Sequence, residues 1–174
     1  VFSSGGGSGT RSFTSTVPRA TSTPGEMEIT SAAKERSGNA SAEARAFWRE
    51  KVAPGLAAGT RHLIVAHQGG DLVGTVQLNL DMPPNQRHRC EISKLLVDAN
   101  ARRQGVGHKL LVAAERVAKS EGRSLITLDT RRGDAAEQLY RGVGYQIAGI
   151  IPRYARATDS DRLDDTVVLY KELA

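Results

Sequence analysis

Residues 91–111 combine an apolar strand pattern, a basic turn with two glycines, and the start of an amphipathic helix. Within the turn, Arg102, Gly105 and Gly107 follow the spacing R-x-x-G-x-G. A helix N-terminus leaves its first amide N–H groups without partners and carries partial positive charge. Glycines let such a backbone approach a ligand, and arginines add formal charge. The pattern therefore predicts an anion cradle for a phosphate or pyrophosphate.

A tight basic turn without any ligand is the alternative interpretation of this segment. The spacing stops short of the dinucleotide fingerprint G-x-G-x-x-G because position 110 is Leu, and it lacks the G-K-[ST] ending of a P-loop. On spacing alone the two interpretations are about equally good, so the rest of the chain has to distinguish them.

Size and composition exclude several classes of protein. The 174 residues suit one domain with a core. A net charge of +5 is compatible with an anionic partner, but 5% aromatic residues and no recognition motif argue against nucleic acid. No apolar run approaches the ~18–20 residues that span a bilayer, so we expect no membrane partner. The single cysteine, Cys90, excludes an internal disulfide framework and fits a cytoplasmic location.

The start of the chain differs in composition from the remainder. Its first 25 residues contain no acidic side chain and are dominated by Ser, Thr and Gly. We expect a disordered tail over 1–26, with a transit peptide as the alternative. A folded domain then occupies 27–174. Its first strand and helix are weak or missing, because 27–30 suggest only a strand stub and 32–36 only a helical turn.

Apolar periodicity predicts the elements of that domain. A hairpin turn at 68–71 separates two strands, and Pro54–Gly55 is expected to end the first helix. The predicted elements are helices at 41–52, 105–120 and 134–143, and strands at 63–66, 71–80, 90–97, 125–129, 145–151 and 166–170. This order is typical of a mixed α/β or α+β sheet with helices on its faces.

Two segments together resemble a known family. Val97 and the 102–107 turn resemble motif A of the GCN5-related N-acetyltransferases (GNAT). Residues 136–145, in which Tyr140 precedes a Gly-Tyr pair, resemble motif B. The resemblance covers about 41–174 and implies a mixed, mostly antiparallel twisted sheet. Its two central parallel strands are splayed, and helices cover both faces.

A narrower resemblance, carried by 91–97, 128–130 and 151–155, is to the subgroup that contains tabtoxin-resistance acetyltransferase. It implies acetyl transfer from acetyl-CoA to a primary amine of a small molecule, such as an amino-acid-like toxin, antibiotic or metabolite. A protein N-terminal or lysine acetyltransferase is the alternative within the enzyme class. An acyl-CoA-binding module without turnover is the alternative outside it. A homodimer is left open.

The family resemblance assigns acetyl-CoA as co-substrate and no metal. The pantetheine arm would pair with the main chain of Leu96 and Val97. The pyrophosphate would lie on the amides of 103–108, beside Arg102 and Lys109. The implied cofactor-binding residues are Leu96, Val97, Arg102, Arg103, Gln104, Gly105, Val106, Gly107, His108 and Lys109.

Three residues are candidates for catalysis. The family position makes Tyr140 the general acid for the leaving thiolate; alternatively, its ring only fills an apolar helix stripe. Glu91 and Asp129 are polar positions in apolar strand segments, where a carboxylate could accept the amine's proton. Glu91 could instead pair with Arg89 or Lys94, and Asp129 could accept turn amides. The sequence does not rank the two carboxylates.

Overall fold

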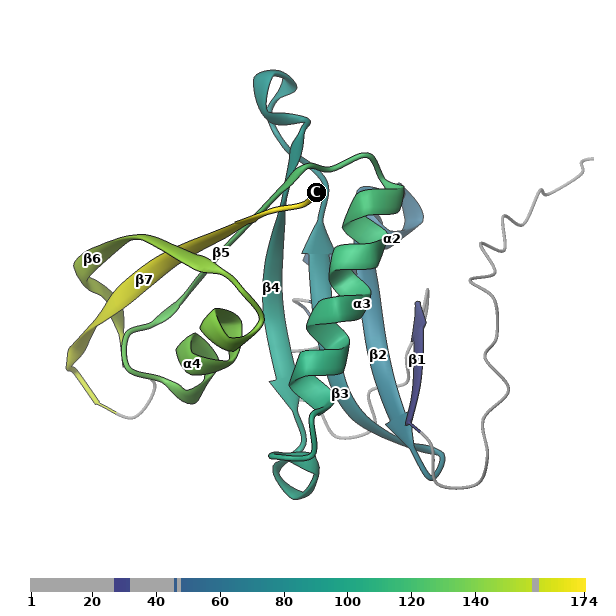
Figure 1. The fold of residues 1–174 in the computed structure, drawn as a ribbon, viewed down its shortest axis with the longest axis horizontal. Helices are drawn as coiled ribbons and strands as arrows, with labels where there is room; N and C mark the ends of the chain where they lie inside the picture. Colours follow the sequence, from purple (N-terminus) through teal and green to yellow (C-terminus); the bar gives the residue numbers. More distant parts are fainter. Residues whose placement is uncertain (1–26, 32–45, 47, 158–159) are drawn as a thin grey trace, which may run out of the picture.

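The protein forms one seven-stranded sheet with helices against it (Figure 1), as seen in a computed structural model that describes residues 27–31, 46, 48–157 and 160–174. The strand order is β1-β2-β3-β4-β5-β7-β6, and every neighbouring pair is antiparallel except β4 and β5. The strands are β1 (Met27–Ser31), β2 (Arg61–Gln68), β3 (Asp71–Asn79), β4 (Arg89–Val97), β5 (Leu125–Arg131), β6 (Gln146–Arg156) and β7 (Leu163–Glu172). The mixed, mostly antiparallel sheet expected from the family resemblance is confirmed.

The helical elements are η1 (Trp48–Val52), α2 (Ala53–Ala57), η2 (Pro84–Gln86), η3 (Ala99–Ala101), α3 (Val106–Ser120) and α4 (Ala135–Gly142). The prediction that Pro54 and Gly55 end a helix was wrong. Pro54 lies in the first turn of α2, where its missing N–H group needs no partner. The predicted tail over 1–26, and most of the predicted helix before Trp48, lie outside the described residues.

The strand stub suggested near residue 27 is a strand of the sheet. β1 pairs with β2 from Met27 opposite Gln68 to Ser31 opposite Ile64. The first strand is therefore present, and it extends the sheet beyond β2.

Helices lie on both faces of the sheet, as predicted. Four consecutive residues of β2, Leu63–Ala66, are buried, which requires cover on both sides because side chains alternate along a strand. Ile64 joins the core together with Leu110 of α3. The α2 helix lies behind the sheet and α3 lies in front of it (Figure 1).

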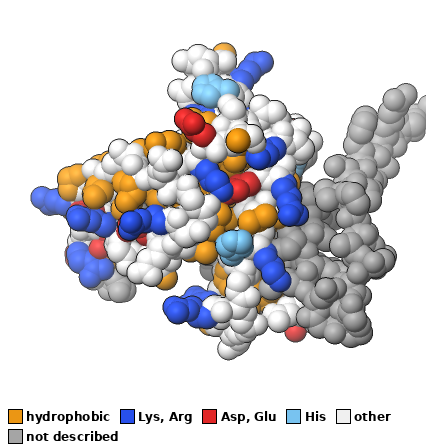
Figure 2. Space-filling view, in the orientation of Figure 1, with side chains coloured by type: hydrophobic (Ala, Val, Ile, Leu, Met, Phe, Trp, Pro, Cys, Tyr) orange, Lys and Arg blue, Asp and Glu red, His pale blue; other side chains and the backbone are white. Residues whose placement is uncertain are grey.

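The edge of the sheet at β6 is less covered by other elements than its central strands are. β6 is an edge strand in which almost every residue is exposed. Its Ile147, Ile150 and Ile151 are 43–45% exposed, and Figure 2 shows hydrophobic side chains gathered over this part of the molecule. In front of β5 and β7, α4 contributes Tyr140 to the main core. The central strands and β7 contribute to the core, and β6 together with the exposed residues 160–163 forms an arm at the edge of the sheet.

Candidate active site

The parallel strands β4 and β5 are paired over only part of their length. Their register ends at Glu91 opposite Thr127. Beyond that point β4 continues with β3, where Leu96 lies opposite Thr75, and β5 continues with β7. The two strands part toward their carboxyl ends (Figure 1), so the predicted splayed pair is confirmed.

A β-bulge bends β4 at the split. The β3–β4 register shifts between Thr75 and Gln77, and Lys94 has a φ of 52°, in the left-handed region. Bulges of this kind bend a strand and increase its twist. Among the described strands, none pairs with the β5-facing edge of Leu96 and Val97, and the Leu96 side chain is 62% exposed. The main-chain groups assigned to the pantetheine arm are therefore accessible.

The turn between β4 and α3 presents an uncapped helix N-terminus. Gly105 is the N-cap residue, and no side chain caps the helix there. The Lys109 amide donates to the Gly105 carbonyl at 3.0 Å. The amides of residues 105–108 therefore precede the first bond of the helix and point out of its end. With the helix dipole, they have the geometry of an anion cradle.

The two glycines of the turn serve different purposes. Gly105 has a φ of 80°, and a Cβ there would meet nothing within 4 Å, so the backbone conformation requires glycine. Gly107 is buried, and a Cβ there would lie 2.7 Å from Cδ2 of Leu139 on α4. The absence of a side chain at Gly107 therefore also leaves room for the neighbouring helix α4, and the approach of a ligand to its amide stays a prediction.

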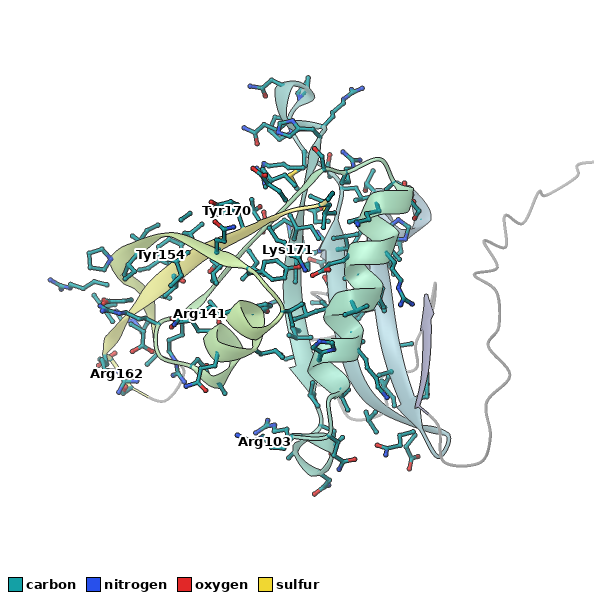
Figure 3. All side chains as sticks on the ribbon, viewed as in Figure 1. Arg103, Arg141, Tyr154, Arg162, Tyr170 and Lys171 are labelled. Atoms are coloured by element: carbon teal, nitrogen blue, oxygen red, sulfur yellow. The ribbon has the colours of Figure 1, made fainter. Side chains whose placement is uncertain are left out.

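Basic side chains surround the cradle at the surface. Arg102, Arg103, His108 and Lys109 are all exposed. The Arg102 Nε donates to the Val97 carbonyl at 3.4 Å, which holds its guanidinium against the turn. Arg103 lies at the bottom of the view in Figure 3, in the turn before α3. The arginine and lysine charges are accessible to a phosphate from solvent.

Gln104 and Val106 are placed differently from the basic residues. The Gln104 side-chain amide donates to the Asn100 carbonyl at 2.9 Å and closes the loop. The Val106 side chain is buried in the core, so only its amide belongs to the cradle.

A cavity of about 240 Å³ lies beside β5 and brings the two candidate carboxylates together. Its walls come from β4, β5, β6 and β7. The lining residues are Glu91, Thr127, Leu128, Asp129, Ile151, Tyr154, Thr166 and Val168. Tyr154 comes from the 153–156 segment of β6 (Figure 3). The cavity therefore combines acidic groups with an aromatic and apolar wall.

The neighbours of Glu91 and Asp129 bear on whether these carboxylates have purely structural partners. Arg89 donates to Thr127 at 3.1 Å and to Gln86 at 2.8 Å, so two of its guanidinium nitrogens have partners, one of them the strand neighbour of Glu91. The Asp129 Oδ2 lies 3.3 Å from the Thr166 hydroxyl, which also lies 2.9 Å from the Thr130 carbonyl. The single hydroxyl proton serves the nearer acceptor best. The Asp129 carboxylate therefore lies beside the Thr166 hydroxyl of β7 but is the weaker of its two possible acceptors.

Tyr140 does not line that cavity, but it belongs to the same core cluster as Leu128, which does. Its ring packs edge-on against Tyr145, with centroids 5.8 Å apart. Burial raises the pKa of Tyr140 to about 12, and the Asp129 charge adds to the effect. The phenol therefore stays protonated at neutral pH and can act there only as a proton donor. Glu91 and Asp129 line one cavity. Tyr140 is connected with this pair through the Asp129 charge, which contributes to its raised pKa.

Sequence reasoning missed part of the cavity wall. Thr166 and Val168 lie on β7, some forty residues after Asp129 in the chain, and only strand pairing brings them together. The one available signal was a polar Thr166 at the start of an apolar strand segment. Cys90 is buried and free, and burial raises the pKa of its thiol to about 11.

Other site types find no support in the described part of the chain. It contains no group of three or more His, Cys, Asp or Glu side chains that could hold a metal ion. No helix in the same residues is long and apolar enough to cross a membrane.

Comparison with known proteins decides the family. The model of the acetyltransferase (GNAT) family matches residues 27–145, which include the bulged β4, the cradle and Tyr140. The chain belongs to this family. Membership confirms the acetyl-CoA-dependent acyltransferase class expected from the two motifs. The tabtoxin-resistance subgroup does not emerge from the comparisons.

The matches to individual relatives cover different shares of this GNAT chain. It is 32% identical over 118 residues to N-alpha-acetyltransferase RimI of Mycobacterium tuberculosis, which is 67% of this chain and 68% of that protein. It is 32% identical over 85 residues to a UPF0039 protein of Schizosaccharomyces pombe, so the match spans about half of each, 49% and 54%. The fold matches yncA of Salmonella typhimurium, solved with its cofactor acetyl-CoA, at a TM-score of 0.68 and 18% identity over 85% of this chain and 94% of that one.

Proposed function

We propose that this GNAT protein transfers the acetyl group of acetyl-CoA to a primary amine of a small molecule, such as an amino-acid-like toxin, antibiotic or metabolite. One observation carries the proposal: Glu91 and Asp129 share a cavity of about 240 Å³. Two carboxylates in one cavity attract a cationic amine. The volume is below the ~300–1,000 Å³ of pockets for drug-sized ligands and suits a molecule of amino-acid size.

The cradle and the open edge of β4 fit acetyl-CoA. The uncapped amides of residues 105–108 suit its pyrophosphate, and Arg102, Arg103 and Lys109 add charge around them. The unpaired edge of Leu96 and Val97 offers main-chain groups to the pantetheine arm. Acetyl-CoA supplies the activated acetyl group as a thioester, and the protein supplies position and proton transfer.

The proposed reaction is a direct attack. Glu91 or Asp129 first takes a proton from the bound ammonium group, directly or through water, which frees the nitrogen lone pair. The nitrogen then forms a bond to the thioester carbonyl carbon, and the carbon–sulfur bond breaks. Tyr140 donates its phenolic proton to the departing thiolate, and the second proton that the nitrogen loses restores the phenol through water. The two carboxylates remain alternative bases, and the one that is not the base binds the substrate cation.

A second candidate acceptor is the terminal amino group of a protein. It is favoured by the similarity to N-alpha-acetyltransferase RimI, and a peptide N-terminus carries the same cationic amine. We propose a cytoplasmic location for either activity, supported by the single free thiol of Cys90.

Release of free CoA distinguishes these functions. The enzyme is incubated with saturating acetyl-CoA and, separately, with small primary amines and with peptides of varied N-termini. We expect the fastest release with a small amine, whereas faster release with peptides would make the protein acceptor the better proposal. Acetyl-CoA at ~100 Kd should stabilise the fold by about 2.7 kcal/mol. Stabilisation without release from any amine would indicate a binding module, and no stabilisation would refute the proposed cofactor.

A further inference from the structure

Lys171 joins three elements of the fold at one ammonium group. It lies on β7, and its Nζ donates to both carboxylate oxygens of Glu115 on α3 at 2.8 Å. It also donates to the carbonyl of Val143, the C-cap residue of α4, at 2.8 Å. Its three donors thus meet three acceptors. Figure 3 shows Lys171 in the space between α3 and α4.

This ion pair is more protected than others on the molecule. The side chains of Lys171 and Glu115 are 24% and 14% exposed, whereas those of Arg156 and Asp161 at the tip of the arm are 65% and 95% exposed. Partly buried charges are screened less by solvent and salt. The cation also lies at the C-terminal end of α4, where the helix dipole favours positive charge.

The same ammonium group contacts the Tyr145 ring, which in turn packs against Tyr140, the proposed acid. Lys171 Nζ lies 5.5 Å from the centroid of the Tyr145 ring, within cation–π range. Tyr145 packs edge-on against Tyr140, and its amide donates to the Tyr140 carbonyl at 3.0 Å. The Tyr145 hydroxyl is buried, and burial, together with the nearby Glu115 carboxylate, raises its pKa. The Tyr145 ring is therefore held by its packing, by Lys171 and by its closeness to Glu115.

The α4 helix needs such an anchor because it is short. It has eight residues, and helices of this length depend on tertiary contacts for their stability. Its first turn is fixed by Asp134, whose side chain accepts from the Ala135 amide, and its middle by Leu139 against Gly107. Lys171 holds the C-terminal end of α4 at Val143, which lies three residues after Tyr140.

We propose that Lys171, held by Glu115, is a positioning residue that places the Tyr140 hydroxyl for proton donation. The inference rests on the proposed function, in which Tyr140 protonates the thiolate. Proton transfer requires donor and acceptor within about 2.6–3.2 Å, so a small shift of α4 lowers kcat. Neither Lys171 nor Glu115 lines the acceptor cavity or belongs to the 102–108 turn. Neither side chain is therefore one of the groups proposed to contact acetyl-CoA or the amine.

The first test compares Lys171→Met with Lys171→Arg. We expect Lys171→Met to lower kcat about tenfold, with the Kd for acetyl-CoA and the KM for the amine unchanged. Lys171→Arg keeps a cation at the end of α4 and should recover most of the loss. Lys119→Met, at an exposed position of α3, is the matched control and should leave kcat unchanged. A loss that appears in KM or Kd instead of kcat overturns the inference.

The second test is a double-mutant cycle with Tyr140→Phe. If Lys171 acts through Tyr140, Lys171→Met should lower kcat in the wild-type background and add little when Tyr140 is already Phe. Equal losses in both backgrounds overturn the inference and leave the proposed function intact. An unchanged kcat in Tyr140→Phe alone refutes the proposed acid instead. If Lys171→Met does not fold, Glu115→Gln, which keeps the volume and a hydrogen-bond acceptor, enters the same cycle with the same expected results.

Discussion

The cradle at the start of α3 and the cavity beside β5 are built in different ways. The cradle comes from one continuous stretch of chain, and its ligating groups are the backbone amides of 105–108 at an uncapped helix end. The cavity takes its walls from four strands, and its chemistry comes from side chains, with Glu91 on β4 and Asp129 on β5. Tyr140 lies on α4, outside both regions.

This difference separates recognition of the donor from recognition of the acceptor. Backbone amides bind a phosphate whatever the neighbouring side chains are, provided the backbone keeps its shape. Side chains from four strands can change one at a time, and each change alters which amine fits. On the proposed function, the cradle binds the donor common to the family, and the cavity selects the acceptor. The following predictions test whether the two regions are in fact independent.

The largest effect is expected from Tyr140→Phe. Loss of the phenolic proton should lower kcat by about 10²–10⁴-fold, and the Kd for acetyl-CoA should stay the same because Tyr140 lies outside the cradle. Steady-state kinetics and isothermal titration calorimetry measure the two quantities. An unchanged kcat would remove Tyr140 from the mechanism.

The raised pKa of Tyr140 predicts how kcat should depend on pH. Burial and the Asp129 charge raise its pKa to about 12, above the ordinary value near 10. The protonated form is the donor, so deprotonation of Tyr140 should cause no fall in kcat between pH 8 and pH 10. A fall in this range that disappears in Tyr140→Phe would contradict the raised pKa.

The next effect concerns the acceptor cavity alone. Of Glu91→Gln and Asp129→Asn, the variant that removes the base should lower kcat by about 10²-fold, and the other should mainly raise the KM for the amine. Neither should alter acetyl-CoA affinity. Asp161→Asn, on the exposed tip of the arm, is the control. Normal kinetics in both cavity variants would separate the cavity from the reaction.

The free energies of unfolding of variants at Gly105 and Gly107 test the different surroundings of these two glycines in the cradle. Gly107→Ala should gain less than the ~1 kcal/mol that alanine normally adds inside a helix, because the new Cβ lies 2.7 Å from the Leu139 side chain, which has to move. The change in stability should become more favourable when Leu139 is also Ala. Gly105→Ala should cost about 1–2 kcal/mol through its positive φ, with no relief from Leu139→Ala. Urea denaturation of the single and double variants measures this, and equal effects of Gly107→Ala in both backgrounds would refute the contact.

The smallest effect is expected from a single cradle charge. Arg103 is exposed, so Arg103→Ala should weaken acetyl-CoA binding by about 0.2–1 kcal/mol. The difference should fade at high salt, where the Debye length is short. Arg156→Ala, at the exposed tip of the arm, controls for general loss of charge. A salt-independent loss at Arg103 would indicate a structural role for this side chain.

The local parts of the molecule were predictable from sequence. The hairpin after β2, the amphipathic α3 and the glycine turn each depend on residues close together in the chain, and all three are present. The family resemblance supplied the splay between β4 and β5, and the paired motifs made it recognisable. The position of Pro54 in the first turn of α2 was misread, because proline is compatible with both the end and the start of a helix.

Contacts between distant elements were not predictable in the same way. Thr166 reaches Asp129 only because β7 pairs with β5. Lys171 is an ordinary lysine in the sequence, and it becomes an anchor only where β7, α3 and α4 meet. The purpose of Gly107 depends on the side chain of Leu139, which lies 32 residues further along the chain.

Amine-dependent release of CoA tests the central claim most directly. The assay follows free CoA thiol with saturating acetyl-CoA and a panel of small primary amines, with wild type and Tyr140→Phe in parallel. We predict release that depends on the amine and is lost in Tyr140→Phe while acetyl-CoA still binds. Tight acetyl-CoA binding with no release from any small amine or peptide would contradict the claim that the cradle and the cavity form one active site.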